Sequence, residues 1–242
     1  MFIKKVKLYT SIALLLSSSA FAKESIEWSY NGLNGPDKWG KLDKEFMACD
    51  EGLMQSPIDI SKKNLISNKS PIIFDYAKYG LSENKHGMKY FARTKNIKID
   101  HITYDLSQFH FHAPSEHSID NQIFAAELHF VHHDKDGNLA VIGVFFKEGK
   151  SNPAFSSLVS SVHEGKKKRL ELESEDLMFL LPENKEYFHY MGSLTTPPCT
   201  EGVNWYVLKY PVEASKEELL ALDKSMADNA RPVQNSAGRV AK

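Results

Sequence analysis

The sequence has only two cysteines among its 242 residues, and its formal net charge at pH 7 is -1. So small a charge argues against a nucleic acid or an anionic membrane as the partner. No internal repeat and no Gly/Ser-rich linker divides the chain, which favours one domain over two. A His-Glu-x-x-His stretch is also absent, and this argues against a zinc peptidase.

The first 22 residues have the pattern of a secretory signal. A lysine-rich start precedes a short, mostly apolar run over residues 8–16, and an Ala20-Phe21-Ala22 cleavage motif follows. We therefore expect a mature domain over residues 23–242 that is exported to the periplasm. A retained membrane anchor is the alternative, but the apolar run is too short to span a bilayer.

Export has a consequence for the two cysteines. The periplasm is oxidising, so we expect Cys49 and Cys199 to form a disulfide. A bridge that closes so long a loop would stabilise the fold by about 5 kcal/mol through chain entropy. Two buried free thiols are the alternative, which fits export less well.

Most of the remaining chain has the pattern of short strands separated by turns. Segments rich in β-branched and aromatic residues predict strands over residues 72–76, 88–92, 97–99, 104–111, 123–132, 140–147, 186–191 and 203–210. Turn-forming residues at 133–138 separate two of them. Many strands, short turns and few helices indicate a mainly β fold with a mostly antiparallel sheet.

Two helices are predicted from their start signals. Asn152 and Pro153 are typical of the first positions of a helix. Ser215 and Glu218 form a capping box for a second helix. The apolar residues that we expect on the inward faces are Phe155, Leu158 and Val162 in the first helix and Leu219, Leu222 and Met226 in the second.

Two histidines, His110 and His112, stand one residue apart in a predicted strand. In a strand, residues i and i+2 point to the same face, whereas on a helix this spacing would place them about 200° apart. His129 in another predicted strand would supply a third imidazole. Three neutral ligands with one open position are the arrangement of a catalytic zinc. The alternative is three histidines whose hydrogen bonds are purely structural.

The other histidines fit such a site less well. His132 lies on the opposite face of its strand from His129, and His133 lies about 13 Å further along at the rise of a strand. The remaining candidates, which lack ligand-like spacing and which we expect to be structural or surface residues, are His101, His163 and His189.

A series of motifs runs through nearly the whole mature sequence. In chain order they are Trp28-Ser29-Tyr30, Asn34-Gly35-Pro36, Trp39, Gln55-Ser56-Pro57-Ile58-Asp59-Ile60, Phe109-His110-Phe111-His112, Ser115-Glu116-His117, Ala126-Glu127-Leu128-His129, Gly192-Ser193-Leu194-Thr195-Thr196-Pro197-Pro198-Cys199 and Asn229-Ala230-Arg231-Pro232. In this order and spacing they resemble the α-class carbonic anhydrases, of the exported bacterial kind.

The resemblance implies a single domain on a large, twisted, mostly antiparallel sheet, with a metal at the base of a conical cleft. It implies a zinc-dependent lyase that hydrates carbon dioxide reversibly to bicarbonate and a proton, through attack of a zinc hydroxide on carbon dioxide. It also implies cis peptide bonds before Pro57 and Pro198.

By the same resemblance, zinc is the cofactor and its ligands are His110, His112 and His129. A ligating imidazole needs an acceptor on its other nitrogen, which fixes the tautomer. Gln108 and Glu127 each lie two residues before a ligand, and the resemblance gives them this role together with the backbone of Asn229. The alternative for Glu127 is a carboxylate that faces solvent. The residues on either side of Glu127 in the strand are apolar, however, so we expect the strand face that carries His129 to be the polar face.

Thr195 and Glu116 resemble the residues that orient the zinc hydroxide. The Thr195 hydroxyl would accept the hydrogen bond of the hydroxide, and ionised Glu116 would accept the hydrogen of Thr195. Bound zinc can lower the pKa of water to about 7, which gives hydroxide at neutral pH. The alternatives are a turn residue for Thr195 and a surface carboxylate for Glu116.

Carbon dioxide is apolar, so its pocket should be hydrophobic. The residues that the resemblance places in that wall are Val131, Val141, Leu194, Val203 and Trp205. Val131 also follows His129 by two residues and so shares its face of the strand. Thr196 would contact bicarbonate or an inhibitor at the mouth. Ordinary core positions are the alternative for the apolar residues.

A proton must leave the site to regenerate hydroxide, and a histidine with a pKa near 6.5 suits that transfer. His86 lies where the resemblance places the proton shuttle, with Tyr30 and Asn84 in the adjoining water network. Lys85 replaces the glycine of the common Asn-Gly-His pattern. An ordinary solvated loop histidine is therefore the alternative for His86.

The resemblance implies carbon dioxide and bicarbonate as substrates and sulfonamides and anions as inhibitors, and it allows a homodimer. Two other classes of protein are alternatives to an enzyme. A periplasmic zinc-buffering protein would explain the three histidines but not Thr195 and Glu116. An inactive binding module of the same fold usually lacks a ligand histidine, and none is missing here.

Overall fold

The computed structural model describes residues 26–62, 70–76, 79–84, 87–92, 96–163, 174–226 and 228–236. In residues 79–84, 87–92, 161–163 and 174–176 the description covers the backbone alone. The predicted signal over residues 1–22 lies outside the described residues. Among the helices that are described, none is long and apolar enough to cross a membrane.

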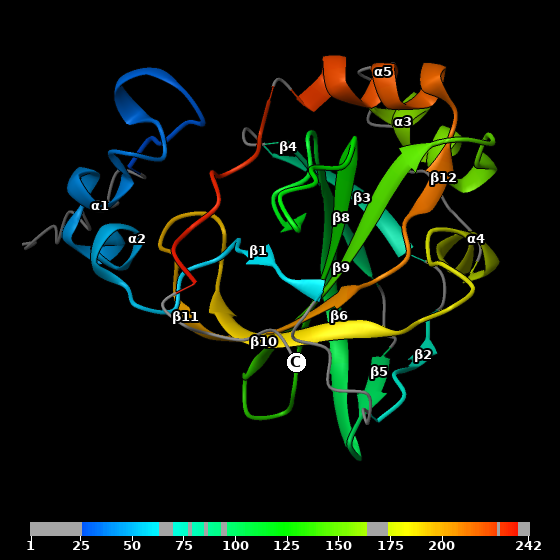
Figure 1. Ribbon diagram of the computed structural model, residues 1–242, viewed down its shortest axis with the longest axis horizontal. Coiled ribbons are helices and arrows are strands. Elements are labelled where there is room, and N and C mark those ends of the chain that lie inside the picture. Colours follow the sequence, from blue (N-terminus) through cyan, green and yellow to red (C-terminus); the bar gives the residue numbers. More distant parts are fainter. Residues whose placement is uncertain are drawn as a thin grey trace, which may run out of the picture.

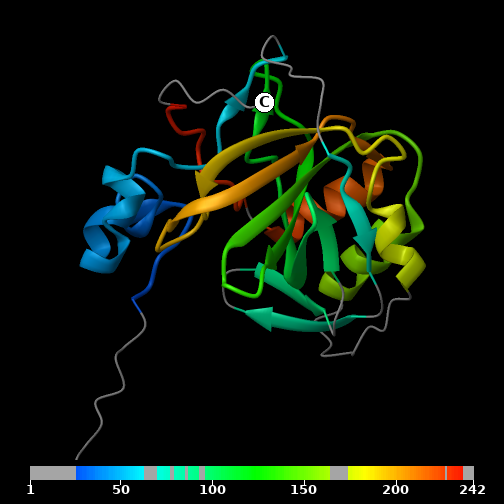
Figure 2. The same ribbon diagram turned by 90° about the horizontal axis from the view of Figure 1, so that it is seen from below.

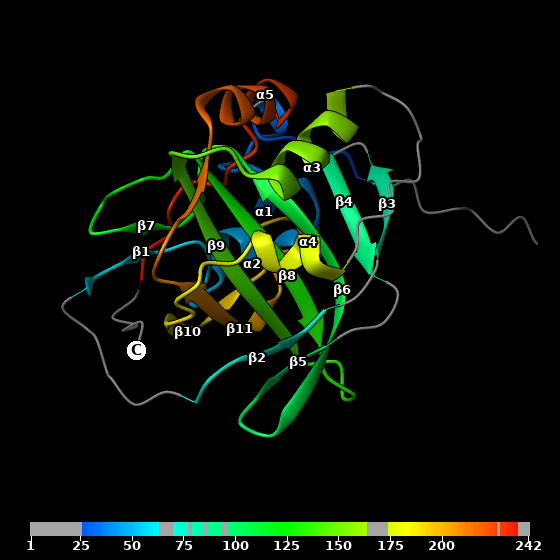
Figure 3. The ribbon, with the colours of Figure 1, turned by 90° about the vertical axis from the view of Figure 1, so that its right-hand side faces the viewer.

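One large curled sheet carries most of the described strands (Figure 1, Figure 3). Its strands are β2 (Ile73–Asp75), β3 (Tyr79–Asn84), β4 (Gly87–Ala92), β5 (Asn96–Ile99), β6 (Ile102–His112), β8 (Ala126–His133), β9 (Leu139–Glu148), β10 (Tyr187–Ser193), β11 (Glu201–Leu208) and β12 (Val212–Ala214). The path is β10-β11-β9-β8-β6-β4-β3, with β5 joined to β6 and β2, and β12 joined to β9. The pairs are antiparallel except that β11 and β12 run parallel to β9, so the predicted mostly antiparallel sheet is confirmed.

Every predicted strand corresponds to a strand of this sheet, with ends that shift by up to three residues. The largest shift is at β8, which begins at Ala126 rather than at Ile123. Phe124 instead bonds to Ser115, donating its N–H to Ser115 Oγ at 2.9 Å and accepting from Ser115 N at 3.1 Å. The local hydrogen bonds of that loop therefore take the place of the predicted strand pairing.

The sequence pattern misses some short strands. They are β3 and β12 of the large sheet, and the separate parallel pair β1 (Asp59–Ile60) and β7 (Ser118–Ile119). Strands of two or three residues show no alternation of polar and apolar side chains. β3 contains Gly, Ser and Asn, which are residues of low strand propensity or turn-forming character.

Both predicted helices begin where their start signals place them. Asn152 Oδ1 accepts hydrogen bonds at 3.1 Å from two backbone amides in the first turn of α3 (Pro153–His163). In front of α5 (Lys216–Met226), Ser215 N donates to Glu218 Oε2 at 2.7 Å and Glu218 N donates to Ser215 Oγ at 3.3 Å. The reciprocal pair is a capping box, as predicted.

Five short helical segments have no counterpart in the sequence prediction. They are η1 (Gly32–Asn34), α1 (Trp39–Leu42), η2 (Lys44–Phe46), α2 (Ala48–Glu51) and α4 (Ser174–Phe179). One or two turns are too short to show the helical period of apolar residues. α1 and α2 lie together, away from the pair α3 and α5 (Figure 1, Figure 2).

Two hydrophobic cores lie on opposite faces of the central strands. The core that includes residues of α3 and α5 takes Phe109 and Phe111 of β6 and Leu128 and Phe130 of β8. Because side chains alternate along a strand, the histidines between these residues point away from the helices. The second core, built around Trp205, lies on that other side.

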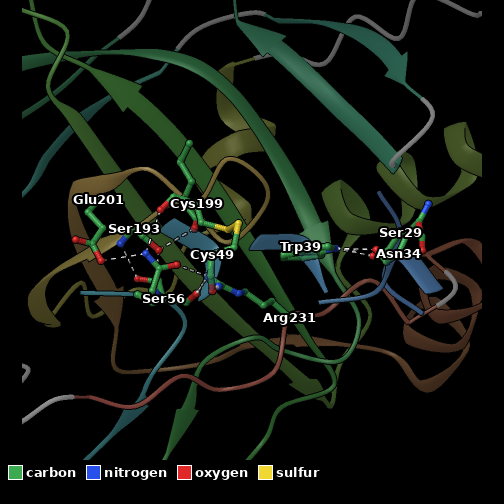
Figure 4. Close-up of a disulfide and its surroundings, with 11 residues drawn as sticks. Ser29, Asn34, Trp39, Cys49, Ser56, Ser193, Cys199, Glu201 and Arg231 are labelled. Atoms are coloured by element: carbon green, nitrogen blue, oxygen red, sulfur yellow. Dashed lines mark hydrogen bonds between the residues drawn. A yellow bond between two sulfur atoms is a disulfide. The ribbon is translucent and has the colours of Figure 1, made fainter. Parts of the chain in front are cut away.

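The predicted disulfide between Cys49 and Cys199 is confirmed, with the two Cα atoms 5.0 Å apart (Figure 4). A buried polar bridge joins the same two segments. Arg231 Nη2 donates to Cys49 O at 2.8 Å, and Arg231 Nη1 donates to Gln55 Oε1 at 2.9 Å. Gln55 Nε2 in turn donates to Cys199 O at 3.1 Å. The two cysteine backbones are therefore held by hydrogen bonds as well as by sulfur.

Three X-Pro bonds in the described residues are cis. The bonds before Pro57 and Pro198 are cis, as the resemblance implies, and the bond before Pro114 is cis without having been predicted. Pro114 lies between His112 and Glu116, and Pro198 lies three residues after Thr195. Both of these proline bonds therefore lie beside predicted site residues.

Candidate metal centre

The register of two neighbouring strands brings the three predicted ligands together. β6 and β8 pair antiparallel, so that His110 lies opposite His129. The ring centroids are 4.9 Å apart for His110 and His112, 5.4 Å for His110 and His129, and 4.6 Å for His112 and His129. One nitrogen of each ring lies within 4.8 Å of the others. The three imidazoles can therefore hold one metal ion.

Each ring has an acceptor on one of its nitrogens. His110 Nδ1 lies 2.8 Å from Gln108 Oε1, and His112 Nδ1 lies 2.7 Å from the carbonyl oxygen of Asn229. The third contact joins His129 Nε2 to Glu127 Oε1 at 2.9 Å. An acceptor on one nitrogen keeps the hydrogen there and leaves the lone pair of the other nitrogen for a metal.

The donor set fits a metal ion in its chemistry as well as its spacing. Three imidazoles from two rigid strands suit zinc and other divalent metals of its kind. A second group, His117, Glu127 and His129, also has its donor atoms within 4.8 Å. Its atoms are joined at 2.8 and 2.9 Å, which is hydrogen-bond distance and leaves no room for an ion between them. Of these two groups of described residues, the first therefore has the better geometry for an ion.

Burial sets the charge of the groups around His129. Burial raises the pKa of Glu127, but the neighbouring rings of His117 and His129 outweigh this effect and hold the pKa well below its usual range. Burial lowers the pKa of the His129 ring. A neutral imidazole beside a carboxylate is the state in which histidine binds a metal.

Glu116 lies beside the three rings and is only 2% exposed. Its Oε2 is 3.4 Å from His112 Nε2 and 3.8 Å from His129 Nδ1, and its Oε1 accepts from Arg231 N at 2.8 Å. Burial raises the pKa of Glu116 to about 7, while His129, the Arg231 amide and the Thr195 side chain act in the opposite direction. The structure thus places Thr195 and Glu116 in contact next to the candidate ligands.

The predicted hydrophobic wall forms part of one cluster. Val141, Val203 and Trp205 are buried in it, and Val131 and Leu194 pack against it. The indole of Trp205 meets the ring of His129 edge to face, with centroids 4.8 Å apart. An apolar surface therefore adjoins the candidate metal centre. Thr196, which follows Thr195, is partly exposed.

The other histidines whose side chains the structure describes lie in structural or surface positions. His132 Nε2 lies 3.0 Å from the Tyr76 hydroxyl, and burial lowers the pKa of His132 to about 3. His133 Nδ1 lies 2.7 Å from Ser107 Oγ. His189 Nε2 lies 3.2 Å from the side chain of Asn204, and His101 is exposed in a turn.

The predicted proton pathway falls partly outside the described residues. His86 lies outside the described residues, and only the backbone of Asn84 is described, at the end of β3. The ring of Tyr30 packs edge to face against Trp28 and Trp39, with centroids 5.5 and 5.7 Å apart. Burial raises the pKa of Tyr30, and the charge of Glu116 raises it further.

Sequence reasoning gave no role to several residues that surround the site. His117, Tyr190 and Ser56 form buried hydrogen bonds that lead to Glu127, and Arg231 holds Glu116. His117 follows Glu116 in a quoted motif, so its position was visible. Tyr190 shows no spacing relation to the ligands, since it contacts His117 across 73 residues of sequence.

Comparison with known proteins agrees with this geometry. The family model described as eukaryotic-type carbonic anhydrase matches residues 34–241. A carbonic anhydrase of Pectobacterium atrosepticum is 38% identical over 239 residues, covering 95% of this chain and 97% of that protein. The α-carbonic anhydrase of Thermovibrio ammonificans, solved with the inhibitor sulfanilamide, is 40% identical with a TM-score of 0.79, covering 89% of this chain and 98% of that one. Dioscorin complexed with ascorbate is 29% identical with a TM-score of 0.80, covering 88% and 96% of the two chains.

The family match covers most of the chain, and the bacterial relative is similar over nearly the full length of both proteins. The curled sheet and the register of β6 against β8 are the structural counterpart of that similarity. The chain therefore belongs to the eukaryotic-type, or α-class, carbonic anhydrases, the enzymes that hydrate carbon dioxide reversibly to bicarbonate.

Proposed function

We propose that zinc is the metal of this centre and that His110, His112 and His129 bind it. The observation that carries the proposal is the pairing of each imidazole with an acceptor on its far nitrogen. Such acceptors fix the tautomer and the ring orientation of zinc-binding histidines. Three protein ligands leave a fourth position open, as catalysis requires.

Thr195 and Glu116 orient the reacting water in this proposal. Bound zinc supplies a water that ionises near neutral pH. In its ionised form, which dominates above the pKa of about 7, Glu116 takes the hydroxyl hydrogen of Thr195, so that the Thr195 oxygen acts as an acceptor toward the centre. The Arg231 amide holds Glu116 Oε1 at 2.8 Å. A fixed carboxylate therefore sets the direction of the Thr195 hydroxyl, and that hydroxyl sets the direction of the water.

The apolar cluster beside the rings is the proposed place of carbon dioxide. Val131 and Leu194 pack on the buried Val141, Val203 and Trp205. An apolar wall excludes competing water and leaves the apolar substrate close to the centre. Thr196 would contact bicarbonate, sulfonamides or anions, since a Thermovibrio relative binds sulfanilamide.

Proton release is assigned to His86, with Asn84 and Tyr30 ordering the water between it and the centre. Tyr30 lies close enough to Glu116 for the charge of Glu116 to affect its pKa. A His86→Ala variant should slow hydration, and added imidazole buffer should restore it if His86 is the shuttle. An unchanged rate in weak buffer would contradict this assignment.

The decisive experiment is stopped-flow hydration of carbon dioxide by the mature chain. The rate is measured on the purified protein, after a chelator has removed the metal, and after zinc has been returned. Fast hydration that disappears with the metal and returns with zinc supports the proposal. A folded, zinc-loaded sample without activity would contradict it.

A zinc-buffering protein is the second candidate, and Thr195→Ala distinguishes the two. We expect hydration to fall by roughly 100-fold, because the loss of one orienting group at a reacting centre has effects of this order. Zinc content should stay the same, since Thr195 is not a ligand. Thr103→Ala, at an exposed position of β6, is the control and should hydrate at the parent rate. Unchanged hydration in Thr195→Ala would favour buffering.

We further infer that residues 1–22 are a signal and that residues 23–242 form the mature catalytic domain in the periplasm. The disulfide supports this proposal, because such bonds persist in oxidising compartments. Mass spectrometry of the protein from a periplasmic extract should show an N-terminus at Lys23.

We propose a homodimer from the resemblance alone. Analytical ultracentrifugation, which measures the mass of the protein in solution, tests this proposal.

A further inference from the structure

A chain of buried polar contacts leads away from His129, and the proposed function uses only the first of them, between His129 and Glu127. Glu127 Oε1 lies 2.9 Å from His129 Nε2 and 2.8 Å from His117 Nδ1. His117 Nε2 lies 2.6 Å from the hydroxyl of Tyr190, which lies 2.8 Å from Ser56 Oγ. Each of these side chains is at most 3% exposed. We call these five residues the relay.

The carboxylate of Glu127 is fully engaged at this junction. Its Oε2 accepts from the backbone amides of Glu116 at 3.0 Å and His117 at 2.8 Å. Its Oε1 accepts from His117 Nδ1 at 2.8 Å and lies 2.9 Å from His129 Nε2. Three of the roughly four lone-pair sites of the carboxylate are therefore used before His129 is counted. Glu127 therefore cannot turn toward either ring without losing a bond that is buried away from water.

The hydrogen atoms of the relay run in one direction when His117 is neutral. Glu127 only accepts, so His117 donates to it from Nδ1 and accepts at Nε2 from the hydroxyl of Tyr190. The Tyr190 hydroxyl has one hydrogen, so its oxygen accepts from Ser56 Oγ, which itself accepts a backbone amide at 3.0 Å. Since Glu127 only accepts, His129 carries its hydrogen on Nε2 and keeps the lone pair of Nδ1.

The packing leaves the Tyr190 ring little freedom to move. The ring stacks on Trp205 with centroids 6.3 Å apart, and Tyr190 and Trp205 are also register partners in β10 and β11. A Cβ atom added at Gly192 would lie 2.1 Å from Ser56 Oγ and 2.8 Å from Tyr190 Cε2. The absence of a side chain at Gly192 thus allows Ser56 and Tyr190 to approach the same point.

We propose that Tyr190 and His117 are positioning residues for the metal centre, because they hold Glu127 as the acceptor that keeps His129 in its metal-binding tautomer. The inference rests on the proposed metal role of His129. Partners outside the ligand set tune metal affinity by about 10- to 100-fold when they contact a ligand directly. Tyr190 acts through two further groups, so we expect an effect of about 3- to 10-fold.

The test is the rate at which Tyr190→Phe releases zinc to a chromogenic chelator in excess. The hydroxyl is removed while the ring remains, and release should be about 3- to 10-fold faster than in the parent protein. Tyr76→Phe is the matched control. It also removes a buried tyrosine hydroxyl that contacts a histidine Nε2 on β8, at 3.0 Å from His132. Its zinc release should equal that of the parent.

A second readout follows the tautomers directly. In the parent protein with ¹⁵N-labelled histidine, NMR should show His117 with a hydrogen on Nδ1 that is bonded to Glu127, and His129 with its hydrogen on Nε2. This measurement needs no variant that must fold.

A second variant tests the far end of the relay. Ser56→Ala removes the hydrogen-bond donor to Tyr190 but leaves Tyr190 itself unchanged. Its zinc release should be faster than that of the parent and slower than that of Tyr190→Phe.

The outcomes separate this inference from the proposed function. A parent protein that binds no zinc contradicts the metal centre itself. A parent that binds zinc, with equal release rates in Tyr190→Phe and Tyr76→Phe, contradicts the relay alone. A hydrogen on Nε2 of His117 contradicts the direction of the hydrogen atoms. Faster release in Tyr190→Phe only, with the predicted tautomers, supports the inference.

Discussion

Removal of the Cys49–Cys199 bridge should lower the stability of the fold much more than its activity. The bond joins residues that are 150 positions apart. The chain-entropy relation gives a loss of about 5 kcal/mol for a loop of this length. In domains of this size each kcal/mol shifts the melting temperature by about 2–4 °C. We therefore expect a decrease on the order of 10–20 °C.

The structure explains why the chemistry should survive. Without the sulfur bond, Arg231 still donates to Cys49 O and to Gln55 Oε1, and Gln55 still donates to Cys199 O. Cys199 N also donates to Thr196 O at 2.9 Å. These bonds keep the loop after Thr195 near its native position in the folded state. The bridge thus acts mainly on the unfolded chain, where no such bonds exist.

The assay compares the parent protein with a Cys49→Ala/Cys199→Ala double variant. Calorimetry and urea unfolding give the stability difference, and stopped-flow hydration at 25 °C should give rates within about two-fold of each other. Reductant should not shift the melting temperature of the double variant, which controls for other effects of the reagent. Equal stabilities would refute the entropic argument, and lost hydration in a folded double variant would refute the role assigned to Arg231 and Gln55.

Two further predictions concern buried groups. A Cβ atom added at Gly143 would lie 2.8 Å from Glu127 Oε1, so the variant Gly143→Ala should displace this carboxylate. We expect zinc release in the chelator assay to become about 10-fold faster. An unchanged release rate would mean that Glu127 does not hold His129. Burial lowers the pKa of His132 from 6.5 to about 3. Only the unfolded chain binds this proton between those values, so His132 should reduce the unfolding free energy by about 1.4 kcal/mol per pH unit as pH falls through this range. Urea unfolding at pH 6, 5 and 4 should therefore give slopes that differ by about 1.4 kcal/mol per pH unit between the parent and Tyr76→Phe/His132→Phe, because the other titrating groups are common to both. Equal slopes in the two proteins would contradict the assignment.

The parts of the site that the sequence predicts are those that depend on local period. His110 and His112 share a face because a strand repeats every two residues. The same rule places Gln108 beside His110 and Glu127 beside His129, and the structure has both contacts. The start signals of α3 and α5 are also local, and both are confirmed. Short segments such as β1 and α2 contain too few residues to show a repeat of polar and apolar positions, so the sequence does not predict them.

The groups that support the site depend instead on the order of the strands. Tyr190 lies on β10 and His129 on β8, and β11 and β9 separate these strands in the sheet. The two side chains are linked through His117, which comes from the loop after β6 and contacts both Tyr190 and Glu127. No spacing rule within one strand could connect them. A chain could therefore retain all three ligand histidines and still bind zinc less tightly, if the residue at position 190 lacked a hydroxyl group to direct at His117.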